Sequence, residues 1–145
     1  MSANVSREAL AGVFADLDWA NIDDLYEMAL KSGVFGPGFY SKVFQTAAKD
    51  AIRRALKHGK LKDVDGTIIK VASIVMRDKL TGKSSRVYKR EDLFTVEDAW
   101  QVYSYWDRYE RRGRKMKRYY ATLGKKLHGV NFTRLFPCFK EESLA

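Results

Sequence analysis

Residues 67–89 read TIIKVASIVMRDKLTGKSSRVYK and carry the clearest local pattern of the chain. The first part of this stretch, 67–76, is rich in β-branched side chains, which favour a strand. The Asp and Gly of 78–82 are typical of a loop, and 85–89 has the composition of a second, shorter strand. We therefore predict an antiparallel β-hairpin here.

The residues before the hairpin predict three helices. Asn21 is a good N-cap for the second helix because its side chain can accept a backbone hydrogen bond, and Gly33 is suited to end that helix. Three glycines and a proline within 32–38 predict a turn after it. Apolar spacing and these signals place the helices at about 7–15, 22–31 and 39–58.

The residues after the hairpin predict a long helix over 95–123, with Thr95 as its N-cap. If that helix stayed regular, its aromatic face would next receive Arg114 and Arg118, which a core cannot accept. Packing must therefore end or turn near Gly113. The remaining segment, 124–145, is expected to dock on the body of the protein.

Length and composition limit the class of protein. A chain of 145 residues with 46% hydrophobic residues is the size of one ordinary domain, and we expect a single domain over 1–145. A single cysteine cannot form an internal disulfide, no apolar stretch has the length of a membrane span, and no signal peptide is evident. We expect a cytoplasmic or nuclear protein that makes no contact with a membrane.

The charge is strongly positive and segregated along the chain. The formal net charge is +9, which attracts polyanions. Residues 41–90 hold fourteen basic residues against four acidic ones, and 111–140 hold ten basic residues and no acid. Residues 1–40 and 91–110 are net acidic. A surface that is merely soluble mixes the two signs more evenly, so we predict an acidic partner, with nucleic acid favoured.

The helix predicted at 39–58 is the first candidate contact with nucleic acid. Its apolar stripe is rich in alanine, and its opposite stripe is polar and mostly basic. Lys and Arg contact phosphates, while Gln, Thr and Arg can also bind base edges in a major groove. The candidate residues on this helix are Lys42, Gln45, Thr46, Lys49 and Arg53. An ordinary solvated helix face is the alternative.

The order of the predicted elements over residues 7–92 resembles the winged helix-turn-helix layout. That resemblance implies that the helix at 39–58 enters the major groove and that the hairpin is the wing. The wing would bring Lys79, Lys83 and Arg86 to phosphates, with Arg77 beside them. The turn at 32–38 is longer than the tight turn usual for this motif. The predicted fold class is therefore α+β, mostly α, with a winged helix-turn-helix-like domain followed by a long basic helix.

The run at 111–118 is the third candidate, because six of its eight residues are basic. Such a run is costly to bury and repels itself, so it is expected to stay in solvent and bind an anion. Its basic residues are Arg111, Arg112, Arg114, Lys115, Lys117 and Arg118. Nearby tyrosines could stack on unpaired bases or pack in a core: Tyr105, Tyr109, Tyr119 and Tyr120. The run also fits a nuclear localisation signal.

Catalytic and metal-binding patterns are weak. Asp63 and Asp65 have the spacing of a metal-binding carboxylate pair, with Asp78 further on, but Asp-Gly at 65–66 favours a simple turn. Two histidines, His58 and His128, and one cysteine, Cys138, make a poor metal site. No nucleophile–base arrangement and no glycine-rich phosphate loop is present. We expect neither an enzyme, nor a cofactor, nor a bound metal.

These observations predict a non-enzymatic nucleic-acid-binding protein, with double-stranded DNA favoured and transcription regulation the expected task. One alternative is an adaptor or inhibitor that binds an acidic surface of another nucleic-acid-handling protein, and another is an RNA or single-strand binder. A homodimer could form through the aromatic helix face of Trp100, Tyr103 and Trp106, although the same face could pack in its own core.

Overall fold

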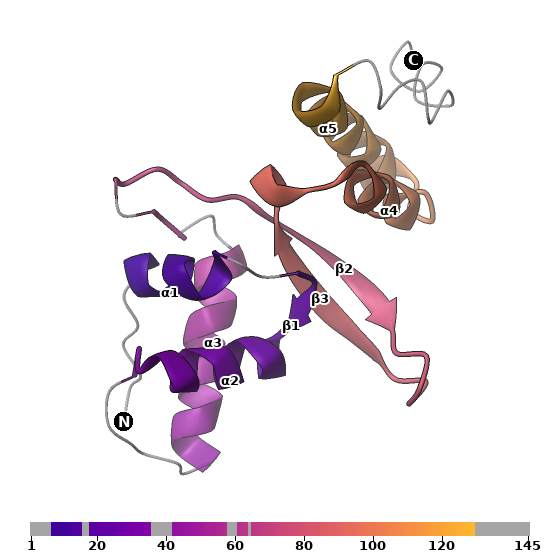
Figure 1. The fold of residues 1–145 in the computed structure, drawn as a ribbon. Helices are drawn as coiled ribbons and strands as arrows, with labels where there is room; N and C mark the ends of the chain where they lie inside the picture. Colours follow the sequence, from indigo (N-terminus) through magenta and orange to yellow (C-terminus); the bar gives the residue numbers. More distant parts are fainter. Residues whose placement is uncertain (1–6, 16–17, 36–41, 58–60, 64, 130–145) are drawn as a thin grey trace. The chain divides into compact units, whose positions relative to one another are not determined.

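The computed structural model is a mixed α+β structure that is mostly helical (Figure 1). It describes residues 7–15, 18–35, 42–57, 61–63 and 65–129. The chain divides into two compact units, which we call unit 1, Met1–Arg90, and unit 2, Glu91–Ala145.

Unit 1 contains the three helices that the sequence predicts. They are α1 (Arg7–Phe14), α2 (Ile22–Ser32) and α3 (Lys42–Lys57). The Asn21 side chain accepts a hydrogen bond from the Asp24 backbone, and the Asp24 side chain accepts one from the Asn21 backbone, so a capping box fixes the start of α2. Gly33 ends α2 with a φ of 77°, a left-handed conformation that favours glycine. Residues 36–41 and 58–60 lie outside the described residues.

The predicted hairpin is confirmed as β2 (Val71–Arg77) and β3 (Ser84–Arg90), which pair antiparallel. A third strand, β1 (Ala20–Asn21), pairs with β3 through Ala20↔Tyr88 and Asn21↔Val87, giving the sheet order β1-β3-β2. Two residues are too short for a periodic signal, and the sequence did not predict this strand. It joins the chain between α1 and α2 to the hairpin.

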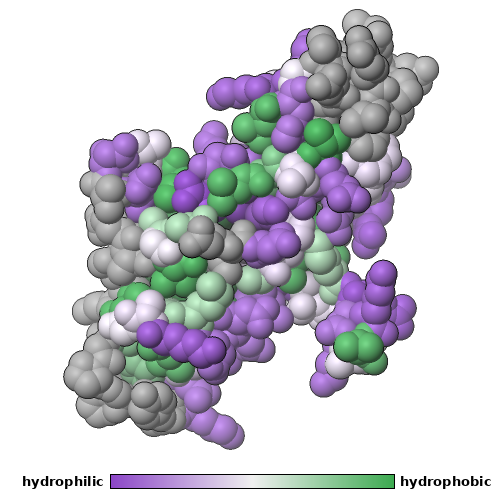
Figure 2. Space-filling model, in the orientation of Figure 1, coloured by the Kyte–Doolittle hydropathy of each residue, from purple (hydrophilic) through white to green (hydrophobic). Residues whose placement is uncertain are grey.

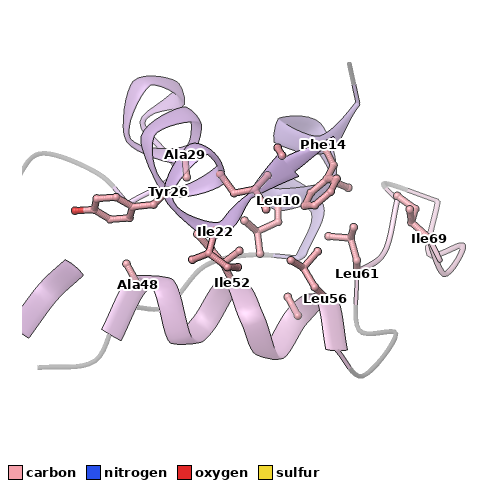
Figure 3. Close-up of a cluster of buried hydrophobic side chains, with 14 of the residues drawn as sticks. Leu10, Phe14, Ile22, Tyr26, Ala29, Ala48, Ile52, Leu56, Leu61 and Ile69 are labelled. Atoms are coloured by element: carbon pink, nitrogen blue, oxygen red, sulfur yellow. The ribbon is translucent and has the colours of Figure 1, made fainter. Parts of the chain in front are cut away.

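The core of unit 1 lies between its helices (Figure 3). Leu10 and Phe14 from α1 point toward Ile52 and Leu56 of α3, and α2 adds its own apolar face. Leu61 and Ile69, between α3 and the hairpin, are buried in the same cluster. The predicted alanine-rich stripe of α3 faces this core and leaves the opposite stripe to the surface.

Unit 2 begins with a short 3-10 turn, η1 (Glu91–Leu93), followed by α4 (Val96–Trp106) and α5 (Arg111–His128). Thr95 caps α4 in a capping box with Asp98, as its sequence position predicts. The single helix expected over 95–123 is wrong, because the chain turns between Trp106 and Arg111 and α5 packs on α4.

Glycine 113 explains where this turn lies. A Cβ atom on Gly113 would sit 2.4 Å from the Trp106 carbonyl oxygen and 3.0 Å from the Tyr109 Cβ. Only a glycine therefore lets α5 start so close to the end of α4. The α5 helix also continues through Gly124 to His128, so these residues are helical and do not form a separate docking segment. Residues 130–145 lie outside the described residues.

Candidate nucleic-acid interface

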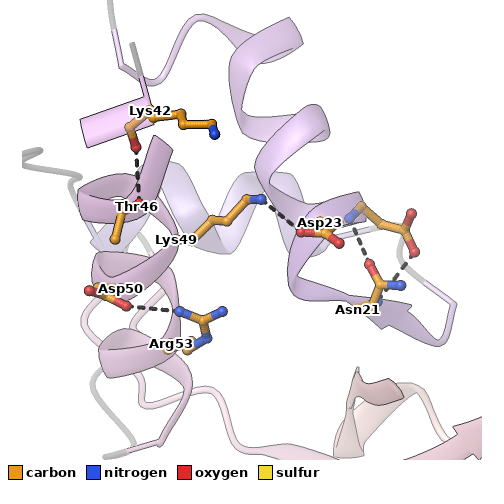
Figure 4. A network of polar contacts seen from close by, with 8 residues as sticks. Asn21, Asp23, Lys42, Thr46, Lys49, Asp50 and Arg53 are labelled. Carbon is orange, nitrogen blue, oxygen red and sulfur yellow. Dashed lines mark hydrogen bonds and ion pairs between the residues drawn. The ribbon is translucent and has the colours of Figure 1, made fainter. Parts of the chain in front are cut away.

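The polar stripe of α3 is on the surface, but two of its predicted contact residues are held by acids of the same unit (Figure 4). Lys49 Nζ lies 2.8 Å from an Asp23 carboxylate oxygen on α2 and 5.4 Å from the centre of the Tyr26 ring. Arg53 pairs with Asp50 at 2.8 Å, one turn away on α3 itself.

These pairs leave α3 with few cations available to a partner. Lys42 is exposed, and the Thr46 hydroxyl donates to the Lys42 carbonyl oxygen at 3.0 Å. Gln45 is half-buried. Arg54, which the helical wheel did not place on this stripe, is also exposed. The side chain of Lys57 lies outside the described residues. The face is therefore less positive than its sequence predicts.

The hairpin presents its cations at the end that extends beyond the core. From Arg77 to Arg86 every side chain is exposed. The predicted residues Lys79 and Lys83 flank the tip. Arg86 donates to the Ser73 hydroxyl at 3.0 Å, and the Arg77 Nε donates to the Gly82 carbonyl oxygen at 3.2 Å. Both acceptors are uncharged. Neither guanidinium group forms an ion pair with an acid of the described residues.

The loop at the tip is fixed by Asp78. Its Oδ1 atom accepts hydrogen bonds from the backbone of Leu80 at 2.8 Å and Thr81 at 3.2 Å. The backbone N–H of Gly82 donates to the Asp78 carbonyl oxygen at 2.8 Å, and Gly82 has a φ of 71°. Asp78 is therefore a turn residue, as its position in the loop predicts, and its carboxylate is used in holding the loop.

The α5 helix carries the most continuous basic surface of the described chain. At about 100° per residue its six principal cations fall within an arc of roughly 120°, opposite the face that packs on α4. These cations are Arg111, Arg114, Lys115, Arg118, Lys125 and Lys126, and all are exposed. No ion pair joins any of them to an acid of the described residues. Their backbone positions span roughly 22 Å of helix axis.

The start of α5 adds to this positive field. Glu110 makes no side-chain cap, so the first backbone N–H groups of α5 have no such partner. Arg111, Arg112 and Arg114 lie in this first turn, where the helix dipole is positive and cations are unfavourable. Arg112 lies over the Trp106 ring, 5.7 Å from its centre. An anion bound here would reduce the repulsion among these arginines. It would also interact favourably with the positive end of the helix dipole.

Lys117 is the exception in the basic run. The sequence predicts that the whole run stays in solvent, and this is wrong for Lys117, which is only 7% exposed. Its Nζ lies 2.9 Å from the Asp107 carboxylate and 5.6 Å from the centre of the Tyr103 ring. A buried lysine needs such a partner, so Lys117 ties α5 to the end of α4 and does not face a phosphate.

Two of the four tyrosines suggested for base stacking are buried in unit 2. Tyr105 and Tyr120 are 7% and 3% exposed, so stacking on bases is wrong for both. The Tyr120 ring stacks on Phe94, and the Tyr105 hydroxyl is 3.2 Å from the hydroxyl of Tyr109. Tyr109 and Tyr119 remain at the surface.

Glu91 is buried in unit 2 and forms a partly buried polar contact that the sequence did not predict. Its carboxylate accepts a hydrogen bond of 2.6 Å from the Tyr119 hydroxyl. Burial, followed by this hydrogen bond, raises the pKa of Tyr119 well above its usual range. Burial and the nearby charge of Glu91 raise the pKa of Tyr120 as well. Both tyrosines therefore stay neutral where ordinary tyrosines ionise.

The aromatic face of α4 packs largely inside unit 2. Tyr103 is buried, its ring is stacked with Trp100, and Trp106 packs with Tyr105 and Tyr109. The Trp106 indole nitrogen is buried without a hydrogen-bond partner among the described residues. Packing within one chain therefore accounts for most of the face suggested for a dimer.

The ion pairs explain part of the segregation of charge. Asp18 pairs with Lys89 at 3.1 Å within unit 1. This contact, Lys49–Asp23 and Lys117–Asp107 each join an acid of an acidic block to a lysine of the following basic block. Each pair joins two residues of the same unit. Among the described residues, most of the exposed cations that no ion pair joins to an acid lie at the hairpin tip and on α5.

The weaker candidates have structural roles. The Asp65 carboxylate accepts a hydrogen bond from the Thr67 backbone at 3.1 Å, which lowers its pKa, and Gly66 donates to the Asp63 carbonyl oxygen. His128 Nε2 lies 2.8 Å from the Phe94 carbonyl oxygen. Within the described ranges, no group of three His, Cys, Asp or Glu side chains could hold a metal ion. His58 and Cys138 lie outside these ranges.

No helix in the described part of the chain is both long and apolar enough to cross a bilayer. Comparison of the chain with protein-family models, with curated proteins and with solved structures found no match.

Proposed function

We propose that this protein is a non-enzymatic nucleic-acid-binding protein that holds duplex DNA through the basic face of α5 and the hairpin of unit 1. The observation that carries the proposal is the α5 face. Its six exposed cations form no ion pair with an acid of the described residues, and they repel each other in the absence of a polyanion. A phosphate backbone neutralises such a row and releases counterions.

Unit 1 supports a winged helix-turn-helix role in this proposal. α2 and α3 are two consecutive helices, and the β2–β3 hairpin follows them. The pairing of β1 with β3 holds the hairpin to the helices, as a wing requires if it is to keep its position beside a recognition helix. The α3 helix would then present Lys42, Gln45 and Thr46 to a groove, with Lys49 and Arg53 turned to their acids.

The test is a fluorescence anisotropy titration against random duplex DNA, single-stranded DNA and duplex RNA at about 50 and 200 mM salt. We expect the tightest binding to duplex DNA and a steep loss of affinity at the higher salt. A double variant, Lys115→Gln with Arg118→Gln, should reduce the slope of log K against log salt by about 1.8, which corresponds to two phosphate contacts.

The matched control is Lys31→Gln with Lys62→Gln, which removes the same charge outside the proposed surfaces. If both double variants change the slope equally, net charge acts without a defined contact surface. If the wild type binds none of the three nucleic acids at the lower salt, the proposal is wrong, and an acidic protein surface becomes the partner to seek.

A further inference from the structure

The tip of the β2–β3 hairpin carries one large apolar side chain that the described residues leave almost fully exposed. Leu80 is 96% exposed, far more than the other large apolar side chains on the surface. Figure 2 shows a hydrophobic patch surrounded by hydrophilic side chains where the hairpin tip lies in Figure 1. At this exposure Leu80 contributes almost no buried apolar surface to the fold, so its side chain is free to enter an apolar site on a partner.

The loop holds Leu80 in one place before any partner arrives. The Asp78 carboxylate accepts from the Leu80 backbone at 2.8 Å, which fixes the residue directly. On the other side, Arg77 donates to Gly82 at 3.2 Å and the Lys83 backbone donates to the Thr81 hydroxyl at 3.3 Å. A tip that is ordered in advance loses little conformational entropy when it binds.

The residues beside Leu80 are suited to a polyanion. Residues 77–86 contain four cations and one acid, and the acid, Asp78, is used in the loop. Lys79 precedes Leu80 directly, and Lys83 lies across the loop. An apolar side chain between cations is the combination by which proteins separate stacked base pairs, because the cations hold the phosphates while the wedge enters.

We propose that Leu80 inserts between adjacent base pairs of duplex DNA from the minor groove and that Lys79 and Lys83 hold the flanking phosphates. This inference rests on the proposed function and adds to it a deformation of the DNA. Insertion costs least where stacking is weak, so the protein prefers pyrimidine–purine steps such as TA over a stiff A-tract.

The experiment uses the full chain and two duplexes of equal length, one with a central TA step and one with an A-tract. A 2-aminopurine base beside the central step reports unstacking by its fluorescence, and anisotropy reports affinity. We expect wild type to raise the fluorescence of the TA duplex and to bind it more tightly than the A-tract. Leu80→Ser should abolish the fluorescence rise and the preference. Its affinity for the A-tract should change by less than about threefold, because its cations are intact.

Two further variants serve as controls. Leu80→Met keeps an apolar side chain and should keep the fluorescence rise. Ile68→Ser removes another exposed apolar residue of unit 1, which is 54% exposed, and should change neither signal. Far-UV circular dichroism of each variant confirms that its fold is intact.

The outcomes separate the two proposals. If wild type binds both duplexes but Leu80→Ser unstacks the TA step equally well, the wedge is wrong and the proposed function stands. If wild type binds neither duplex, both fail. If it instead binds vesicles of anionic lipid and Leu80→Ser weakens that binding, Leu80 is a membrane contact and the wedge is overturned.

Discussion

At the scale of single residues, Lys115 and Lys117 are two positions apart on α5 and have opposite surroundings. Lys115 is exposed on the basic face, whereas Lys117 is buried against Asp107 and Tyr103. Lys117→Ala should lower the free energy of unfolding by about 1.5–3 kcal/mol, the range for losing a hydrogen bond between charged groups. Lys115→Ala should leave stability within about 0.5 kcal/mol. Urea unfolding of both variants measures the difference.

For DNA affinity we expect the opposite order of effects in these two variants. Lys115→Ala should weaken binding, and Lys117→Ala should not when it is measured where the variant is fully folded. Equal losses of stability in the two variants would show that Lys117 is solvated, contrary to its 7% exposure.

Tyr119 and Tyr120 give a pH dependence to the stability of unit 2. Both have a pKa raised above the usual value of about 10, because burial and Glu91 disfavour the phenolate. Below about pH 9 the folded and unfolded states are both protonated, and stability from these groups is fully present. As the pH rises above about 10 the unfolded state loses protons that the folded state keeps, so stability falls.

Tyrosinate absorbance at about pH 11, just above the usual tyrosine pKa, tests whether Tyr119 and Tyr120 stay protonated in the folded protein. The folded protein should show fewer than its eight tyrosines ionised, and denaturant should release the rest. In Tyr119→Phe the increase on denaturation should shrink by one tyrosine. An increase of the same size in the variant and the wild type would mean that Tyr119 ionises normally in the folded protein.

At the scale of elements, Gly113 determines how closely α5 can follow α4. Gly113→Ala places a methyl group against the Trp106 carbonyl oxygen, and the backbone cannot move away as a long side chain could. We expect a loss of about 1–3 kcal/mol in stability, the usual cost of overpacking. Gly12→Ala in α1 is the matched control because no atom lies within 4 Å of its added Cβ. It should stabilise by about 0.5–1 kcal/mol.

Thermal unfolding of both glycine variants tests this prediction. A stabilised Gly113→Ala protein would mean that the end of α4 can shift, and the glycine would then have no role in placing the turn.

Element starts that depend on local hydrogen bonds could be predicted from the sequence, and those that depend on packing could not. Asn21 and Thr95 begin α2 and α4 as predicted, since each cap involves residues only three positions apart. The turn between α4 and α5 has no such capping signal, because Asp107 to Glu110 are all compatible with a helix. The charges of Arg114 and Arg118 predicted only that packing ends or turns near Gly113, without showing that α5 packs back on α4. The turn follows from the contact between Gly113 and Trp106, which becomes visible only when both helices are placed.

The candidate site shows the same limit. Helical spacing correctly predicted that Lys49 and Arg53 lie on the outer stripe of α3. It could not show that Lys49 reaches Asp23, because that contact joins residues of two different helices. Composition likewise predicted an exposed basic run but not that one of its lysines is buried.

At the scale of the whole molecule, the net charge of +9 is a poor measure of how many phosphates the protein can bind. It exceeds the number that one face can hold. It also does not show how strongly positive the surface of α5 is. Three lysines pair with acids of their own unit, namely Lys49, Lys89 and Lys117. Most of the exposed cations without such pairs in the described part of the chain lie on α5 and at the hairpin tip. Affinity should therefore depend on these two surfaces more than on total charge.

The salt dependence of the wild type measures this distribution. If most of the α5 cations contact phosphates, the slope of log K against log salt for duplex DNA should have a magnitude of about 4 or more. A magnitude below about 2 would mean that the basic face of α5 is not aligned with a phosphate backbone.

The short strand β1 has a consequence for the order in which the protein is made. Ala20 pairs with Tyr88, so the sheet of unit 1 cannot close until the ribosome has reached that tyrosine. At about 5–20 residues per second, synthesis from Ala20 to Tyr88 takes roughly 3–14 s. During this time α1 and α2 have been synthesised but β1 has no partner strand, and its backbone groups are bonded to water. The newly made chain completes unit 1 only once the hairpin has emerged.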